Sequence, residues 1–148
     1  MDLVIRNARL RGRDGLHDIG VRGGRIAAIE KTAAEKGEQE VDAAGRLVTA
    51  SFANPHIHVD KAFLAEKMDR SRARLWDDAL DETVPLKREY TPEQLMESGS
   101  RIVEMAASFG HTCIRAFVDV DTIAGLRPVE AALEVKKKYA DVMDIRVC

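Results

Sequence analysis

The feature of this sequence that most constrains its fold is a change in hydrophobic pattern near Gly45. Before that point, short apolar runs are separated by glycine turns, and residues 18–29 place Gly23 and Gly24 between two such runs. Two adjacent glycines tolerate the positive φ angles that a tight β-hairpin turn requires. We therefore predict that residues 1–45 form a small β-rich module with a sandwich-like fold.

The second part of the chain alternates strand-like and helix-like segments. The apolar run at 47–52 predicts a short strand, and residues 91–110 begin with Thr-Pro-Glu, which is typical of a helix N-terminus. A strand over 112–120, a helix over 127–139 and a last strand over 144–148 follow. Successive strand-helix-strand units predict a parallel sheet, so the fold class is α/β.

Charge and cysteine content exclude several classes of partner. Lysine and arginine number 23 against 25 aspartates and glutamates, which leaves a net charge of -2. This balance provides no field for nucleic acid or an anionic membrane, and neither is expected as a partner. The two cysteines, Cys113 and Cys148, make no disulfide framework, and no segment approaches the ~20 apolar residues of a membrane span. The first residues are too charged for a signal peptide, so a cytoplasmic protein is expected.

The segment with the clearest chemistry is NPHIHVDK, residues 54–61. Side chains at positions i and i+2 of an extended backbone project to the same side, so His56 and His58 can reach one metal ion while Ile57 turns away. Neutral imidazole is the commonest ligand of zinc and also suits iron. An isolated His-x-His pair is more often a surface pair than a metal site, so its context in the sequence decides between the two.

That context resembles the amidohydrolase superfamily. The order of DLVIRNARL, DIGVRGGRIAAIE, VDAAGRLVTASFANPH and HIHVDK is similar to the N-terminal portion of its members. Residues 110–121, GHTCIRAFVDVD, are similar to the second strand region of cytosine deaminases and N-isopropylammelide isopropylamidohydrolases. The resemblance covers essentially the whole chain. It implies that residues 46–148 form about three strands of a (β/α)8 TIM barrel. It also implies a metal-dependent hydrolase that acts on C–N bonds of aromatic nitrogen heterocycles.

The same resemblance implies roles for three side chains. His56 and His58 would bind one divalent metal ion, zinc or iron, and Lys61 would contact a small heterocyclic substrate. The alternative for Lys61 is an ordinary solvated cation, which is the usual state of lysine. No catalytic acid or base is assigned, because the resemblance gives no matching position in this chain.

The second strand region departs from the family pattern. Family members commonly read RTHVD where this chain has RAFVD over residues 115–119, which predicts a different substrate preference. Asp119 and Asp121 either take part in catalysis or cap the following helix. Arg115 either corresponds to the arginine of the family or pairs with Asp119 or Glu130. The roles of these residues stay open at this point.

Length sets the remaining expectation. A full barrel takes ~250 residues and its site is assembled from several strands, so a chain of 148 residues lacks the later ligands and the acid-base glutamate of the family. We expect the isolated chain to be inactive and to need a C-terminal portion. The alternative is a truncated fragment that forms homo-oligomers through its exposed sheet without catalysis. A small metal-binding module is less favoured, because a closed structural site has four ligands.

Overall fold

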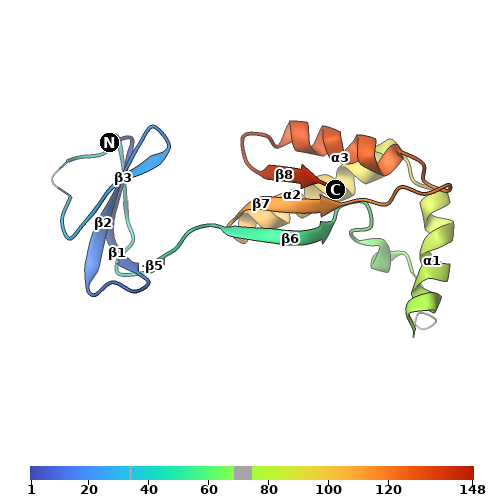
Figure 1. Cartoon of the computed structure of the whole chain (residues 1–148), viewed down its shortest axis with the longest axis horizontal. Coiled ribbons are helices and arrows are strands. Elements are labelled where there is room, and N and C mark those ends of the chain that lie inside the picture. The colour runs from blue at the N-terminus through green and yellow to red at the C-terminus, as the bar shows by residue number, and fades with distance from the viewer. Residues whose placement is uncertain (34, 69–74) are drawn as a thin grey trace. The chain divides into compact units, whose positions relative to one another are not determined.

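A computed structural model describes residues 1–33, 35–68 and 75–148 (Figure 1). They form two compact units, Met1–Ala50 and Ser51–Cys148. The first unit contains a five-stranded sheet, and the second contains a three-stranded parallel sheet with helices. The mixed α/β class predicted from the sequence is confirmed. The division into domains at 1–45 and 46–148 stays a prediction.

The sheet of the first unit has the strand order β3-β2-β1-β4, and β5 also pairs with β1. The predicted hairpin is present between β2 and β3, where Gly23 and Gly24 have φ angles of 60° and 70°. Glycine adopts such angles without strain, because it has no Cβ. The strands are β1 (Leu3–Leu10), β2 (Leu16–Arg22), β3 (Arg25–Glu30), β4 (Gln39–Asp42) and β5 (Leu47–Val48).

The apolar run at 47–52 was predicted to be one strand, and this prediction is wrong. Leu47 and Val48 pair with β1 in the first unit, whereas a separate strand begins at Phe52 in the second. Hydropathy alone cannot separate the two, because both halves are apolar and their pairing partners lie far away in the sequence. A second sheet layer is not among the described residues of the first unit, so the sandwich stays a prediction.

A buried carboxylate ties this first sheet to the loop that follows it. Asp18 accepts hydrogen bonds from the backbone N–H groups of Asn7 and Ala33 and from the Arg6 guanidinium, each at 3.0 Å. Burial alone would raise the pKa of Asp18, but these three donors outweigh it and lower the pKa. Both carboxylate oxygens of Asp18 therefore accept hydrogen bonds.

The second unit is built on strands β6, β7 and β8, which lie side by side and run parallel (Figure 1). Two of its helices occupy the segments predicted as helical, whereas α1, before Thr91, lies in a segment for which no helix was predicted. The elements are β6 (Phe52–His58), η1 (Leu64–Glu66), α1 (Trp76–Arg88), α2 (Pro92–Ser108), β7 (His111–Phe117), α3 (Arg127–Lys138) and β8 (Asp144–Val147). None of the helices in the described ranges is long and apolar enough to cross a membrane.

Helix α2 begins where its sequence predicts. The Thr91 side chain accepts a hydrogen bond from the backbone N–H of Gln94, and the Gln94 side chain accepts one from the N–H of Thr91. This reciprocal capping box satisfies two N–H groups that a helix start leaves free. Farther along α2, a Cβ at Gly99 would lie 2.8 Å from Val135 Cγ2, so glycine allows the close approach of α3.

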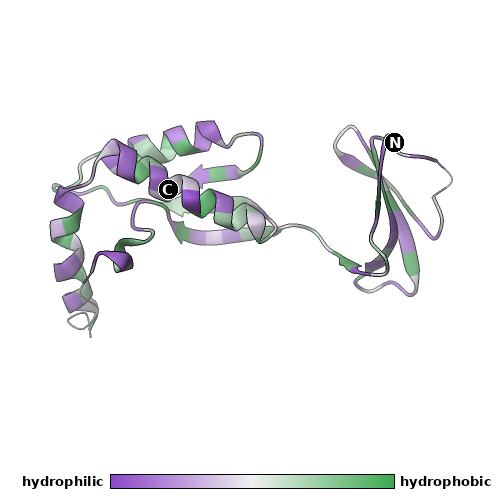
Figure 2. Cartoon of the chain, turned by 180° about the vertical axis from the view of Figure 1, so that it is seen from behind, coloured by the Kyte–Doolittle hydropathy of each residue, from purple (hydrophilic) through white to green (hydrophobic). Residues whose placement is uncertain are grey.

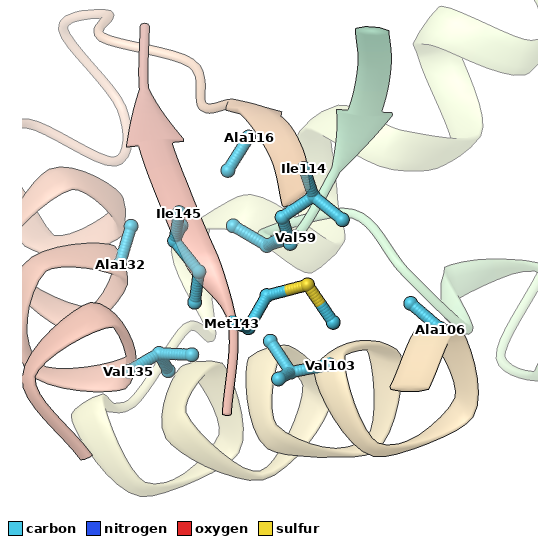
Figure 3. Close-up of a cluster of buried hydrophobic side chains, with 9 residues drawn as sticks. All are labelled: Val59, Val103, Ala106, Ile114, Ala116, Ala132, Val135, Met143 and Ile145. Carbon is cyan, nitrogen blue, oxygen red and sulfur yellow. The ribbon is translucent and has the colours of Figure 1, made fainter. Parts of the chain in front are cut away.

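The core of the second unit lies between its sheet and the helices α2 and α3 (Figure 3). Hydrophobic and hydrophilic residues alternate along these helices in Figure 2, as expected where one helix face packs on a sheet. From β6, Ile57 packs against this core, so its neighbours His56 and His58 face the opposite side. The core residues are Val59, Val103, Ala106, Ile114, Ala116, Ala132, Val135, Met143 and Ile145.

Candidate metal centre

The two histidines of the His-x-His motif lie together at the carboxyl end of β6. Their ring centroids are 5.3 Å apart, and Nε2 of His56 lies 3.4 Å from Nε2 of His58. The same-side arrangement predicted from the i, i+2 spacing is present. The strand places both rings on the sheet face that the helices leave open, because Ile57 between them packs into the core.

The spacing of the two Nε2 atoms fits a shared metal ion. Zinc binds imidazole nitrogen at about 2.0–2.1 Å, so two ligands of a tetrahedral site lie about 3.3 Å apart. The observed separation of 3.4 Å matches this value. Within residues 1–33, 35–68 and 75–148, no group of three or more His, Cys, Asp or Glu side chains is arranged to hold a metal ion. The described part of the chain therefore offers two ligands of such a site.

Phe117, at the end of β7, supports one of these rings. Its ring stacks on His56 with centroids 4.1 Å apart and an interplanar angle of 17°. The sheet register places Phe117 directly beside His58, and the centroids of these two rings are 6.1 Å apart. One aromatic side chain therefore lies next to both histidines. Stacking restricts rotation of the His56 ring and covers one of its faces. The sequence marked Phe117 only as a departure from the family pattern.

Asp60 is the buried acid of the motif, with 3% of its surface exposed. Its Oδ2 accepts a hydrogen bond of 2.9 Å from the backbone N–H of Asp119 and so joins the ends of β6 and β7. Its Oδ1 lies 3.7 Å from Nδ1 of His58. Neither of these two atoms has a hydrogen-bond partner among the described residues. The strand predicted over 112–120 ends at Phe117, because the N–H of Asp119 is directed to this side chain instead of a strand.

A cluster of opposite charges lies next to Asp60. Lys61 Nζ donates to Asp119 Oδ1 at 2.8 Å, and Lys87 Nζ donates to the other oxygen of Asp119 and to Asp121 Oδ2 at 2.9 Å. Lys61 is thus paired with an aspartate at the end of the neighbouring strand. Lys87 comes from α1, and the sequence analysis did not identify it because its partners are more than thirty residues away.

The electrostatics of this cluster favour its charged form. Burial would raise the pKa of Asp119, but hydrogen bonds from Lys61 and Lys87 outweigh it and lower the pKa. Burial would lower the pKa of Lys87, yet the two aspartates raise it. The N–H of Ala124 and the Lys87 ammonium lower the pKa of Asp121 to about 2. Asp119, Lys87 and Asp121 are therefore ionised near neutral pH.

The structure shows the contacts of Asp121 and Arg115, whereas a part of either residue in catalysis stays a prediction. Asp121 Oδ1 accepts from the N–H groups of Ile123 and Ala124, so it caps a turn that precedes α3. Arg115 is exposed on β7 and pairs with neither Asp119 nor Glu130, all three being among the described residues. Asp119 itself caps no helix, because both of its oxygens bind lysines.

Behind Asp60, a cavity of about 240 Å³ extends between the loop after β6 and the start of α2. Asp60, Leu64, Tyr90, Leu95 and Arg101 are among its lining residues. The hydroxyl of Tyr90 is buried and has no hydrogen-bond partner within the described ranges. Burial, followed by the carboxylates of Asp60, Asp119 and Asp121, raises the pKa of Tyr90.

Comparison with known proteins identifies relatives of the whole chain, although no family model matches it. The sequence is 35% identical over 150 residues to N-isopropylammelide isopropyl amidohydrolase of Pseudomonas sp. (strain ADP), covering 99% of this chain and 37% of that protein. The structure of 5-methylcytosine deaminase from Klebsiella pneumoniae, liganded with 5-fluorocytosine, matches with a TM-score of 0.83 at 30% identity, covering 97% of this chain and 35% of the deaminase.

A more distant structure shares the fold. Atrazine chlorohydrolase from Arthrobacter aurescens TC1, a mutant complexed with zinc and atraton, matches with a TM-score of 0.79 at 14% identity. The match covers 99% of this chain and 35% of that one. The chain thus spans about a third of the length of the proteins that it matches, and those with significant sequence identity are named as amidohydrolases and deaminases.

Proposed function

We propose that this chain, which matches the N-terminal portion of amidohydrolase superfamily enzymes over nearly its whole length, supplies part of the metal site of a hydrolase acting on C–N bonds of aromatic nitrogen heterocycles. The observation that carries the proposal is the pair of imidazoles at the end of the first parallel strand. Their Nε2 atoms are 3.4 Å apart, as two ligands of one metal ion would be.

The wider architecture supports this role. Three parallel strands with helices packed on one side are the pattern of the first units of a (β/α)8 barrel, whose active sites lie at the carboxyl ends of the strands. His56, His58, Lys61 and Asp119 all lie at or just after such ends. In this proposal residues 46–148 begin the barrel, and residues 1–45 form the sandwich-like module.

Each residue of the site has a defined task in the proposal. His56 and His58 hold one divalent ion, zinc or iron, which when bound supplies Lewis acidity and activates water near neutral pH. Phe117 keeps the His56 ring in place and shields one face from solvent. Lys61 presents an ammonium, oriented by Asp119, that can donate to a ring oxygen or nitrogen of the substrate.

Two further properties belong to the same proposal. The substrate is a small heterocycle, in line with the names of the relatives, which refer to N-isopropylammelide and 5-methylcytosine. The compartment is the cytoplasm, which the two free cysteines support because reducing conditions keep thiols unpaired. An active enzyme needs the remaining strands of a barrel, on the same polypeptide or on a separate one.

The proposal can be tested by completing the barrel. We expect the 148-residue chain alone to release no ammonia or amine from cytosine-like or triazine-like rings with zinc or ferrous iron supplied. Joining it to the C-terminal portion of the matched Pseudomonas amidohydrolase should produce activity. His56→Ala and His58→Ala should each abolish that activity.

A matched control uses a histidine at the other end of the sheet. His111 begins β7, and its Nδ1 lies 3.1 Å from the Ala106 carbonyl oxygen. His111→Gln should leave most of the activity of the completed protein intact. Turnover by the isolated chain, or activity that survives both His56→Ala and His58→Ala, would contradict the proposal. A chain that forms dimers and binds no zinc would favour a non-catalytic fragment instead.

A further inference from the structure

The contact between buried Asp60 and half-buried His58 has a property that the proposed metal site does not require by itself. Asp60 Oδ1 and His58 Nδ1 are 3.7 Å apart, and both atoms are buried without a hydrogen-bond partner among the described residues. Buried polar atoms normally have partners, because leaving one unpaired costs about 1–3 kcal/mol. Two unpaired atoms this close are complementary, since a carboxylate accepts and an imidazole N–H donates.

The other oxygen of Asp60 is already committed. Oδ2 accepts the backbone N–H of Asp119 at 2.9 Å, which holds the carboxylate in one orientation. Oδ1 is thereby directed to the His58 ring, and a small rotation of that ring brings its Nδ1 to the usual ~2.8 Å of a charge-assisted hydrogen bond. This contact requires a proton on Nδ1.

The position of that proton determines which ring nitrogen can bind a metal. A neutral imidazole carries one proton, so a proton on Nδ1 leaves the lone pair on Nε2. Nε2 is the atom of His58 that lies 3.4 Å from Nε2 of His56. The carboxylate therefore selects the tautomer in which His58 presents a lone pair toward the space that both histidines share.

We propose that Asp60 is a positioning residue that sets the tautomer and ring orientation of His58 and thereby prepares the pair for a metal ion. The proposal rests on the proposed function for the identity of the ligand, but the tautomer is a property of the chain without metal. It can therefore be measured independently. Contacts of this kind typically change metal affinity about 10–100-fold.

The substitution Asp60→Asn separates this role from a merely structural one. The backbone N–H of Asp119 needs an acceptor, so the side-chain oxygen of an asparagine must stay on that side. Its NH2 group then faces His58 Nδ1, which must become an acceptor. The proton of the ring is expected to move to Nε2, although the variant keeps the size of the side chain and the bond to β7.

The first experiment is ¹⁵N NMR of the imidazole rings in the 148-residue chain, at a pH where histidine is neutral. We expect His58 to carry its proton on Nδ1 in the wild type and on Nε2 in Asp60→Asn. His111 is an internal reference, because its Nδ1 faces a carbonyl oxygen that can only accept. Its tautomer should be the same in every variant.

The matched control is Asp119→Asn. It changes the carboxylate that binds Lys61 and Lys87 but keeps the backbone N–H that Asp60 accepts. The His58 tautomer should stay as in the wild type. An Nε2 proton on wild-type His58, or an Asp60→Asn variant that keeps the Nδ1 proton, would overturn the proposal. A shift in Asp119→Asn equal to that in Asp60→Asn would also overturn it, since the effect would then belong to the whole cluster.

The second experiment measures zinc affinity by competition with a chromophoric chelator. Asp60→Asn should weaken binding about 10–100-fold relative to the wild type, whereas Asp119→Asn should change it much less. His56→Ala provides the test of the proposed function. If the wild type and His56→Ala bind zinc equally, the metal site is wrong, whereas the tautomer measurement still decides the role of Asp60.

Discussion

Among the described residues, each unit of this protein has one buried aspartate, and the two differ in their hydrogen bonding. Asp18 in the first unit is 6% exposed and accepts three hydrogen bonds that engage both of its oxygens. Asp60 in the second unit is 3% exposed and accepts one, which leaves Oδ1 facing a histidine. The burial of a carboxylate whose two oxygens both accept hydrogen bonds is explained by its contribution to the stability of the fold. A buried oxygen left without a donor indicates a group retained for function.

The surroundings of the two aspartates extend this contrast. Arg6, beside Asp18, also binds Glu40 and two backbone carbonyls, so its donors are used within the first unit. Next to Asp60, Lys61 and Lys87 both donate hydrogen bonds to Asp119. These bonds connect the end of β6 and helix α1 to the end of β7. The charged groups of the first unit hold a loop to its sheet, whereas those of the second gather at the carboxyl ends of two parallel strands.

The largest expected difference is in the response of the two sites to asparagine. Donors face both oxygens of Asp18. In Asp18→Asn the side-chain NH2 group must therefore face another donor, either a backbone N–H or the Arg6 guanidinium. We expect a loss of about 2–3 kcal/mol from the stability of the first unit. Asp60→Asn keeps its single bond, and we expect a loss below about 1 kcal/mol, since His58 can exchange tautomers.

Hydrogen exchange of backbone amides measures this difference unit by unit. Amides in β1 and β2 should lose protection in Asp18→Asn, and amides in β6 and β7 should change little in Asp60→Asn. Equal losses in the two units would remove the contrast between the two carboxylates, and with it the main reason to assign Asp60 a role beyond stability.

A smaller effect should separate the two lysines of the second unit. Lys87 has 12% of its side chain exposed and serves two aspartates, whereas Lys61 is 29% exposed and serves one. Lys87→Met should cost about 2 kcal/mol, because it leaves Asp121 without its lysine. Lys61→Met should cost about 1 kcal/mol or less. Urea unfolding of both variants gives the comparison, and a larger loss for Lys61→Met would show that Lys61 has the structural role.

The last prediction concerns the response to acid. Asp121 has a pKa of about 2 in the folded chain against an ordinary value of 3.8. A lowered pKa stabilises the folded state above pH 3.8, and that contribution is lost as the pH falls from 3.8 toward 2. Unfolding free energies of Asp121→Asn and wild type, measured across this range, should converge as the pH falls. A constant difference between them would contradict the assignment of the lowered pKa to Asp121.

Much of the candidate site was accessible from the sequence, and the reason is local geometry. The same-side arrangement of His56 and His58 follows from the two-residue period of a strand. Lys61 was identified by resemblance, and the structure adds its partner Asp119. Lys87 was missed, because no pattern in the sequence links a residue of α1 to an aspartate that follows a strand more than thirty residues away.

The sequence by itself determined the elements whose signals lie within a few residues. The positive φ angles of Gly23 and Gly24, the capping box of Thr91 and Gln94 and the alternation around Ile57 depend on neighbouring atoms alone. The tertiary structure decided the pairing of β5 with β1 and the bond between Asp60 and the N–H of Asp119. These contacts join residues far apart in the chain and form only when packing of the core has brought the strand ends together.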